Sequence, residues 1–286
     1  MKRNQFLKSV FTGLAGFGAF TGFAQLLISE SGGLVRKTKQ LNNKIKGGKM
    51  KTILHKADTR GVANHGWLQS KHTFSFANYY DASRMNFGML RVLNDDTVSE
   101  AQGFGTHPHQ DMEIISIPLE GDLEHKDSMG TTAVIKQGDI QVMSAGTGIM
   151  HSEYNANKDK PVKFLQIWVF PDKKGVEPRY DQITMKLEDR KNRLQQVLSP
   201  NADDDGVWIH QNAWFNMTSL DKDKTVSYEL HDTKNNGVYA FLLKGSATIN
   251  EQSLETRDGF GVWNINSLDI TADSNAEILL MEVPMS

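Results

Sequence analysis

Short apolar or alternating segments recur along the chain from Met50 onward, and this periodicity constrains the fold more than any other feature. Turn-forming residues separate most of the segments, a pattern typical of an antiparallel sandwich or barrel. The segments are 87–93, 114–119, 133–136, 140–143, 162–170, 207–210, 226–230, 238–243, 260–265 and 278–283. Helical periodicity is weak, with one candidate short helix at 187–198. The pattern predicts an all-β protein.

Two parts of this β-rich region resemble each other, which indicates a duplicated fold. Residues 114–121 (IISIPLEG) are similar to 238–245 (VYAFLLKG), and residues 138–143 (GDIQVM) are similar to 259–264 (GFGVWN), in the same order. Internal repetition of this kind predicts two copies of one structural unit. We therefore expect two stacked antiparallel β-barrels in one chain, with domains at 50–175 and 176–286.

Two short H-x-[HE] pairs form the candidate site. His107 and His109 lie in GFGTHPH (103–109), and His151 and Glu153 lie in SAGTGIMHSE (144–153). Side chains two residues apart in an extended strand point to one face, so two adjacent strands can direct all four groups at one metal ion. Pro108 has no backbone N–H and biases His107 toward extended geometry, which excludes a helical H-E-x-x-H zinc site.

Glu113 is an alternative carboxylate ligand. It shares strand parity with His107 and His109, so geometry alone does not eliminate it. If Glu153 is the ligand, Glu113 is expected to orient a ligand or to be an ordinary charged strand residue.

The second copy is expected to be metal-free. Aligned without gaps on the first copy from the paired glycines, it brings to the four candidate positions His231, Thr233, Ala272 and Ser274. Only the histidine keeps a ligand type, so this part of the chain is predicted to serve packing or to hold a lost or altered site.

The remaining chemistry-bearing residues have simpler interpretations. Trp67, Phe74, Phe76 and Tyr79 are predicted to be core aromatics or to line the mouth of a pocket. The acidic run at 203–205 lies between a proline and a glycine and is predicted to be a solvated loop. Structural or surface roles are predicted for His55, His65, His72, His125, His210 and His231, with His125 expected to hydrogen-bond near the site.

Composition excludes several functional classes. The 286-residue chain has a formal net charge of -2 and no cysteine. Without excess positive charge on the folded part, nucleic acid is not an expected partner. Without cysteine, a disulfide scaffold, a thiolate nucleophile and a zinc–thiolate site are impossible.

Residues 1–49 read as a leader followed by a basic linker. The first eight residues are basic and residues 10–28 form an apolar, glycine-rich run, as in a signal peptide or membrane anchor. Residues 3–8 (RNQFLK) resemble a twin-arginine export signal, except that Asn4 replaces the second arginine. The prediction is a protein exported to the periplasm or anchored through residues 1–28, which would be its only membrane contact. The basic flank at 36–49 suits neither efficient translocation nor an outward-facing domain, so an uncleaved anchor would keep the main domain cytoplasmic. The alternative is a cytoplasmic protein whose translation starts at Met50, where the foldable sequence begins.

A set of ordered motifs connects the chain with a known family. They are ANHGW (63–67), HTFSF (72–76), FGTHPH (104–109), DME (111–113), LEG (119–121), HKDSMG (125–130), MSAGTG (143–148) and HSE (151–153). From about Met50 to the C-terminus the chain resembles the pirin family of the cupin superfamily, and most closely the bacterial pirins with quercetin 2,3-dioxygenase activity. The resemblance implies a bicupin of two jelly-roll barrels with a metal in the N-terminal barrel only. The implied ligands are His107, His109, His151 and Glu153.

The metal and the reaction follow from these ligands and from the resemblance. Three imidazoles and a carboxylate suit Fe(II), Mn(II), Ni(II), Cu(II) or Zn(II). Iron is expected because the resemblance points to it and because this ligand set leaves positions open for substrate and dioxygen. The implied reaction opens the ring of a flavonol such as quercetin with dioxygen, with Glu153 also acting as the catalytic base.

Two other functions remain as alternatives. Pirins are also linked to regulation, which implies a metal- and redox-dependent binding protein that acts on a transcription factor or a metabolic enzyme. The third possibility is a structural cupin whose site is occupied but inert.

Overall fold

The computed structural model describes residues 49–286, which belong to one compact unit. This part of the chain is almost entirely β-structure, with two short 3₁₀ turns, η1 (Ala57–Thr59) and η2 (Leu187–Arg190). None of the helical segments within it is long and apolar enough to cross a membrane. The predicted leader lies outside the described residues and stays a prediction.

The first half of the fold contains a large sheet and a small sheet. In spatial order the first large sheet consists of β12 (Arg179–Thr184), β9 (Asp139–Ser144), β6 (Glu113–Glu120), β11 (Val162–Val169), β4 (Leu90–Val98), β3 (Leu68–His72) and β2 (Gly61–Asn64). The first small sheet consists of β5 (Gly103–His109), β10 (Ile149–Asn155), β7 (Leu123–Asp127) and β8 (Thr132–Ile135).

The second half repeats this arrangement. Its large sheet consists of β1 (Lys51–His55), β20 (Gly259–Trp263), β17 (Asn236–Lys244), β22 (Ala276–Pro284), β15 (Trp214–Leu220), β13 (Gln195–Ser199) and β14 (Val207–Trp208). Its small sheet consists of β16 (Thr225–Glu229), β21 (Ser267–Ala272), β18 (Ser246–Ile249) and β19 (Gln252–Glu255). All named strand pairs are antiparallel except β13 with β14. The matching strand orders agree with the predicted duplication.

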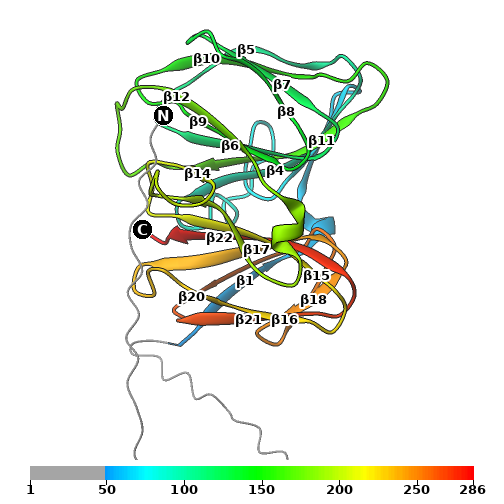
Figure 1. Cartoon of the computed structure of the whole chain (residues 1–286), viewed down its shortest axis with the longest axis vertical. Coiled ribbons are helices and arrows are strands. Elements are labelled where there is room, and N and C mark those ends of the chain that lie inside the picture. Colours follow the sequence, from blue (N-terminus) through cyan, green and yellow to red (C-terminus); the bar gives the residue numbers. More distant parts are fainter. Residues whose placement is uncertain (1–48) are drawn as a thin grey trace, which may run out of the picture. The chain divides into compact units, whose positions relative to one another are not determined.

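The four sheets stack in layers, with the two large sheets packed back to back in the middle (Figure 1). The largest apolar cluster fills the space between the large sheets and includes Ile115, Ile167, Phe241 and Leu279. The central strands β17 and β22 are covered on both faces, which explains why their sequences are nearly continuous apolar runs. By contrast, alternate residues of β10 are buried and exposed, because that strand has solvent on one side.

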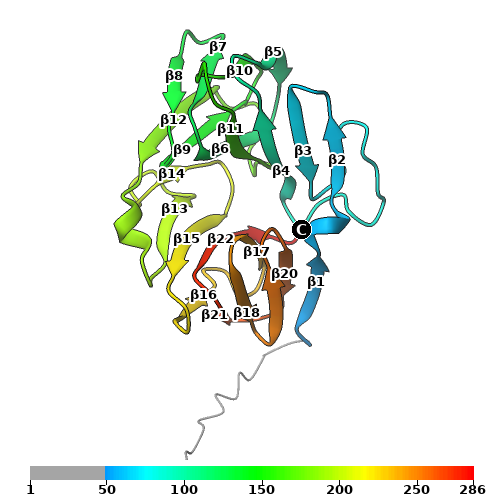
Figure 2. The same cartoon turned by 90° about the vertical axis from the view of Figure 1, so that its right-hand side faces the viewer.

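The two halves exchange their outermost strands. The first strand of the fold, β1, pairs with β20 of the second half, whereas β12, which follows the first half in sequence, pairs with β9 of the first half. Figure 2 shows β1 beside the strands of the second half, while the chain that follows it enters the first half. The chain therefore crosses between the halves near its start and again after β12. The predicted domain boundary between residues 175 and 176 stays a prediction.

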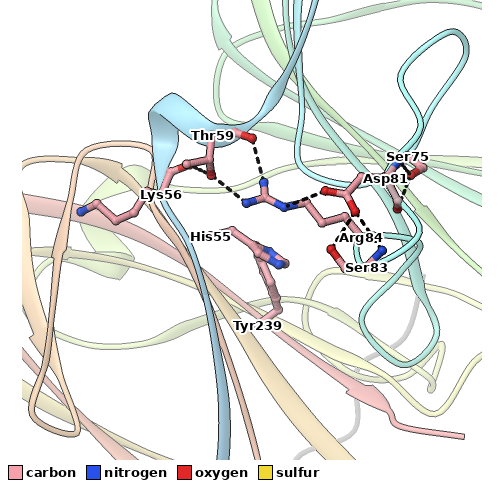
Figure 3. Close-up of polar contacts among 8 residues, drawn as sticks. All are labelled: His55, Lys56, Thr59, Ser75, Asp81, Ser83, Arg84 and Tyr239. Carbon is pink, nitrogen blue, oxygen red and sulfur yellow. Dashed lines mark hydrogen bonds and ion pairs between the residues drawn. The ribbon is translucent and has the colours of Figure 1, made fainter.

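A polar cluster lies where β1 ends and the loop after β3 approaches it (Figure 3). The Nδ1 atom of His55 and the hydroxyl of Tyr239 are 2.8 Å apart and both side chains are buried. Burial lowers the pKa of His55 to about 4, so the imidazole is neutral and can accept the tyrosine proton. Arg84 donates to the carbonyl oxygen of Thr59 at 3.0 Å and lies 3.8 Å from Asp81.

Two features of the predicted architecture are wrong. The sheets are not closed barrels: each half is an open sandwich, because no backbone pairing joins the edges of its small sheet to those of its large sheet. The candidate helix at 187–198 is instead the 3₁₀ turn η2 followed by strand β13. Asn192, between them, has a positive φ of 54°, and pairing of β13 with β15 overrides the weak helical periodicity. The strand segments predicted from sequence all contribute residues to strands.

Candidate metal centre

The two H-x-[HE] pairs lie on adjacent strands of the first small sheet. Strand β5 carries His107 and His109, and strand β10 carries His151 and Glu153. The register places His151 opposite His107, and a bulge follows between His151 and Glu153. The predicted side-by-side arrangement of the two pairs is therefore present, with Pro108 on an edge strand as its missing N–H requires.

His107, His109 and His151 form one compact cluster, called here the histidine group. One ring nitrogen from each lies within 4.8 Å of the others, and among residues 49–286 this is the one group with the geometry to hold a metal ion. The Nε2 atoms of His107 and His151 are 3.0 Å apart. Two nitrogens at this separation can both lie about 2.1 Å from a common point, the usual length of a bond from imidazole to a metal.

Hydrogen bonds to the other ring nitrogens define which nitrogens are free. The Nδ1 atom of His107 lies 2.8 Å from the carbonyl oxygen of Gly105. A carbonyl only accepts, so Nδ1 carries the proton and Nε2 has a free lone pair. The Nδ1 atom of His151 lies 3.4 Å from Nδ1 of His125, and His125 Nε2 lies 3.0 Å from Asp127 Oδ2.

This second chain of contacts fixes the tautomers of His151 and His125. The Asp127 carboxylate accepts the Nε2 proton of His125, which leaves His125 Nδ1 as the acceptor for the Nδ1 proton of His151. His151 Nε2 is then also a free lone pair, and it faces Nε2 of His107 at 3.0 Å. Two lone pairs at this distance repel each other unless a cation lies between them. The donor set therefore fits a metal ion.

The electrostatics of the histidine group also favour neutral imidazoles. The pKa of His109 is lowered to about 4, mainly by burial and to a smaller extent by the neighbouring His107. Burial, followed by the surrounding imidazoles, lowers the pKa of His151 far below its usual range. Neutral imidazole is the form that binds metals. The site is thus prepared for a cation at neutral pH without first having to lose protons.

Glu153 lies beside the histidine group but outside the set of atoms within 4.8 Å of one another. Its side chain is buried, and its carboxylate accepts hydrogen bonds from Gln166 Nε2 at 2.7 Å and from Ser116 Oγ at 3.2 Å. Burial raises the pKa of Glu153, because a carboxylate loses hydration in this interior. A nearby cation would reverse that effect.

Glu113, the alternative ligand, lies elsewhere. It is buried at the start of β6 in the first large sheet, where Ser144 Oγ donates to its Oε2 at 2.7 Å. Burial raises the pKa of Glu113 to about 7, an effect that the hydrogen bond from Ser144 and the charge of Arg179 partly oppose. The structure does not bring this carboxyl into the histidine group.

Two further side chains, His125 and Tyr180, lie beside the histidine group: His125 contacts His151, and Tyr180 packs against His125. His125 on β7 is 1% exposed and its ring centroid is 4.8 Å from that of Tyr180 on β12. The sequence predicted that His125 would hydrogen-bond near the site, and its contact with His151 confirms this. Tyr180 was missed, because only the pairing of β12 with β9 brings it to the site. The spacing His125-x-Asp127 was the available sequence signal for the Asp127 contact.

Aromatic side chains and an open cleft border the histidine group. The Trp168 ring packs edge-on against His109 with centroids 4.9 Å apart, and Phe76 packs edge-on against Trp168 at 5.3 Å. A cleft of about 440 Å³ opens beside His109 and is lined by Pro108, His109, Gln110, Ser128, Gly148, Ile149 and Met150. This volume is within the range of small-molecule sites.

The remaining sequence predictions concern the aromatic residues, the acidic loop and the other histidines. Phe74 is a buried core residue, and the loop at 203–205 is exposed, both as predicted. Phe76 packs against Trp168, which in turn contacts His109. Trp67 packs against Phe104. His65 is exposed, whereas His55 and His72 are buried.

The gapless alignment of the two copies is wrong in register. Strand pairing in the second small sheet equates His107, His109, His151 and Glu153 with Tyr228, Leu230, Leu268 and Ile270. These four side chains belong to the apolar core of the second half. His231 instead stacks on Trp214. The alignment failed because it ignored strand bulges and unequal loop lengths.

Two tandem β-sandwiches with a three-imidazole group in the first define a protein of the cupin class. Residues 55–169 match the pirin family, and residues 196–283 match the quercetinase C-terminal cupin domain. The chain therefore belongs to the pirin family.

Several known proteins are similar to this chain. A quercetin 2,3-dioxygenase from Escherichia coli strain K12 is 46% identical over 231 residues, which cover 81% of this chain and 98% of that protein. A pirin-like protein from Caulobacter vibrioides is 38% identical over 226 residues, 79% of this chain and 96% of that protein. The crystal structure of the bacterial pirin YhhW from Escherichia coli in complex with nickel(II) has 44% identity and a TM-score of 0.78, and the match covers 82% of this chain and 100% of that one.

Proposed function

We propose that this protein is a metal-dependent dioxygenase of the pirin type that opens the ring of a flavonol such as quercetin. The observation that carries the proposal is the pair of imidazole lone pairs, on His107 and His151, that face each other at 3.0 Å. Relatives named quercetin 2,3-dioxygenase support the reaction class. A cation at this point would be held by the histidine group, with Glu153 as the fourth ligand.

The ion would supply Lewis acidity and a template for the oxygen atoms of the substrate. Iron(II) is the metal that we propose, and the nickel(II) complex of the related pirin supports nickel as the alternative. The second half is proposed to be metal-free, since three of the equivalent positions are Leu230, Leu268 and Ile270, and the hydroxyl of the fourth, Tyr228, donates to Glu282 at 2.6 Å.

Each side chain around the histidine group has a separate role in the proposed reaction. Glu153 would accept the proton of the flavonol hydroxyl, because a carboxylate that binds the ion is within hydrogen-bond reach of a hydroxyl bound at the same ion. Gln166 and Ser116 hold that carboxylate in place through their hydrogen bonds. His125 orients His151. In the overall reaction both oxygen atoms of dioxygen enter the cleaved product and carbon monoxide leaves.

Oxygen uptake and carbon monoxide release with quercetin test the proposal directly. Metal-loaded protein is expected to consume one dioxygen per carbon monoxide released, and His107→Ala is expected to abolish turnover together with metal binding. His65→Ala is the matched control, because His65 is exposed and distant in sequence from the histidine group. Elemental analysis should find about one ion per chain. Metal-loaded protein that releases no carbon monoxide would contradict the proposal and favour a regulatory role.

A further inference from the structure

Polar side chains form a continuous row across the inner face of the first large sheet. Strand register places His72 opposite Asn94, Asn94 opposite Gln166, Gln166 opposite Ser116, and Ser116 opposite Gln141. All five are buried. Because Ser116 and Gln166 both contact Glu153 of the small sheet, the row faces the interior of the first half, not the core between the large sheets.

The fold itself does not require this row to be polar. In the second half the corresponding register positions are occupied, from β15 to β20, by Asn216, Leu280, Ala240 and Phe260. The last three belong to one continuous apolar core. In the first half the apolar side chains between the sheets instead form two small clusters, one around Phe164 and one around Ile114. The row lies between these clusters in the sheet register.

Several polar atoms in and beside this row have no hydrogen-bond partner within the part of the chain that is described. They are His72 Nδ1, Asn94 Oδ1, Asp96 Oδ1 and Trp168 Nε1, and all four are buried. Asp96 shares a face with Asn94, since the two are two residues apart on β4. Buried polar atoms in proteins are paired in about 90% of cases or more, so four unpaired atoms in one region need partners, which ordered water or a ligand supplies.

Packed rings link two of these side chains, Trp168 and His72, to the histidine group. Trp168 packs against His109 with centroids 4.9 Å apart, Phe76 packs against Trp168, and His72 packs against Phe76 at 5.2 Å. Asn94 is one strand away from Gln166, which holds Glu153. Adjacent strands are about 4.8 Å apart, so the row extends about 10 Å across two strands, from Gln166 to His72. One ring system can span this distance.

We propose that Asn94, Asp96, His72 and Trp168 form a subsite for ring hydroxyl groups of a polyhydroxylated aromatic ligand. The proposal rests on the proposed function, because it places the reacting end of the ligand at the histidine group and the hydroxylated ring along the row. Phenolic O–H groups donate to Asn94 Oδ1 and Asp96 Oδ1, and Trp168 Nε1 donates to a ligand oxygen. The subsite therefore selects flavonols by hydroxylation of the ring remote from the 3-hydroxy ketone.

Two flavonols that differ only in that ring test the subsite: quercetin, with two hydroxyls there, and galangin, with none. For the metal-loaded full-length protein, kcat/KM for quercetin is expected to exceed that for galangin at least tenfold. Asn94→Leu and Asp96→Leu are each expected to reduce this ratio about tenfold, the usual effect of one lost hydrogen bond. Asn216→Leu, at the corresponding register position of the second half, is the matched control and should keep the ratio.

Two further outcomes separate the subsite from the proposed function. If flavonols turn over but neither variant changes the ratio, the subsite is refuted and the proposed function stands. If the wild-type protein turns over no flavonol, the proposed function fails, and tryptophan fluorescence quenching under nitrogen measures binding instead. Tighter binding of quercetin than galangin that Asn94→Leu or Asp96→Leu equalises would then support the subsite alone. Equal wild-type binding of the two compounds would overturn it.

Discussion

Replacing Glu153 by glutamine tests whether Glu153 is a metal ligand or a structural carboxyl. A ligand role predicts a loss of metal affinity, whereas a structural role predicts a change in the stability of the metal-free protein. Glu153 is 3% exposed, accepts from Gln166 and Ser116, and has a pKa raised by burial. Among residues 49–286 of the metal-free protein, no side chain forms an ion pair with the Glu153 carboxylate within 4 Å. Glu153→Gln removes this charge but keeps the size of the side chain and an oxygen that can accept from Gln166.

The expected magnitudes follow from these contacts. In the metal-free protein the hydrogen bond from Gln166 is kept, so the free energy of unfolding at pH 7 should change by no more than about 1 kcal/mol, or rise as the buried charge disappears. With metal present the substitution removes a direct ligand. Loss of an outer-shell partner already costs 10–100-fold in metal affinity, so Glu153→Gln should cost at least about 100-fold, or about 2.7 kcal/mol.

Competition with a chelator of known affinity measures the loss for Fe(II) and Ni(II), and urea unfolding of the metal-free proteins measures stability. Glu113→Gln is the matched control, because Glu113 is also buried and its carboxyl lies on another sheet. Metal affinity that falls less than threefold for Glu153→Gln would refute its assignment as a ligand. A large fall for Glu113→Gln instead would show that the alternative carboxylate is the ligand.

Three other substitutions test separate parts of the structure. His125→Gln should lower metal affinity 10–100-fold in a chelator competition, because it removes the acceptor that orients His151. Burial raises the pKa of Asp96 to about 7, so its stabilising contribution is complete below pH 4 and lost as the pH rises through 7. Urea unfolding of the metal-free protein should show that wild type loses at most about 4 kcal/mol relative to Asp96→Asn between pH 4 and 8. Tyr239→Phe should cost about 1–3 kcal/mol in unfolding free energy, since His55 Nδ1 loses its partner, while the exposed Tyr80→Phe should have no measurable effect.

Several parts of the site could be predicted because they depend on local geometry. The alternation of side chains along a strand is fixed by the backbone, so His107 and His109 had to share a face wherever their strand lay. The same holds for His151 with Glu153. Apolar segments separated by turns likewise identified several strands of the two large sheets, among them β6, β9, β11, β17, β20 and β22. None of these inferences required knowledge of which strands pair.

Pairing and register were beyond local inference. The exchange of β1 and β12 between the halves joins segments that are far apart in sequence, and no periodicity within either segment reports its partner. The equivalence of Glu153 with Ile270 also follows from register alone, because the chain from Gly138 to Glu153 (15 positions) is longer than the chain from Gly259 to Ile270 (11 positions). The open sheets, in place of closed barrels, are a further consequence of long-range pairing.

By itself, the sequence determined that the chain is a β-rich member of the pirin family. It also determined the four candidate ligands, which form two pairs of residues on two strands. The tertiary structure decided which of their nitrogens are free: Asp127 and His125 set the tautomer of His151 through a contact between strands. It also decided that the interior beside Glu153 is polar, because a row of side chains across five strands exists only after those strands are in register. Proton positions and buried polarity depend on neighbours in space, and only folding defines those neighbours.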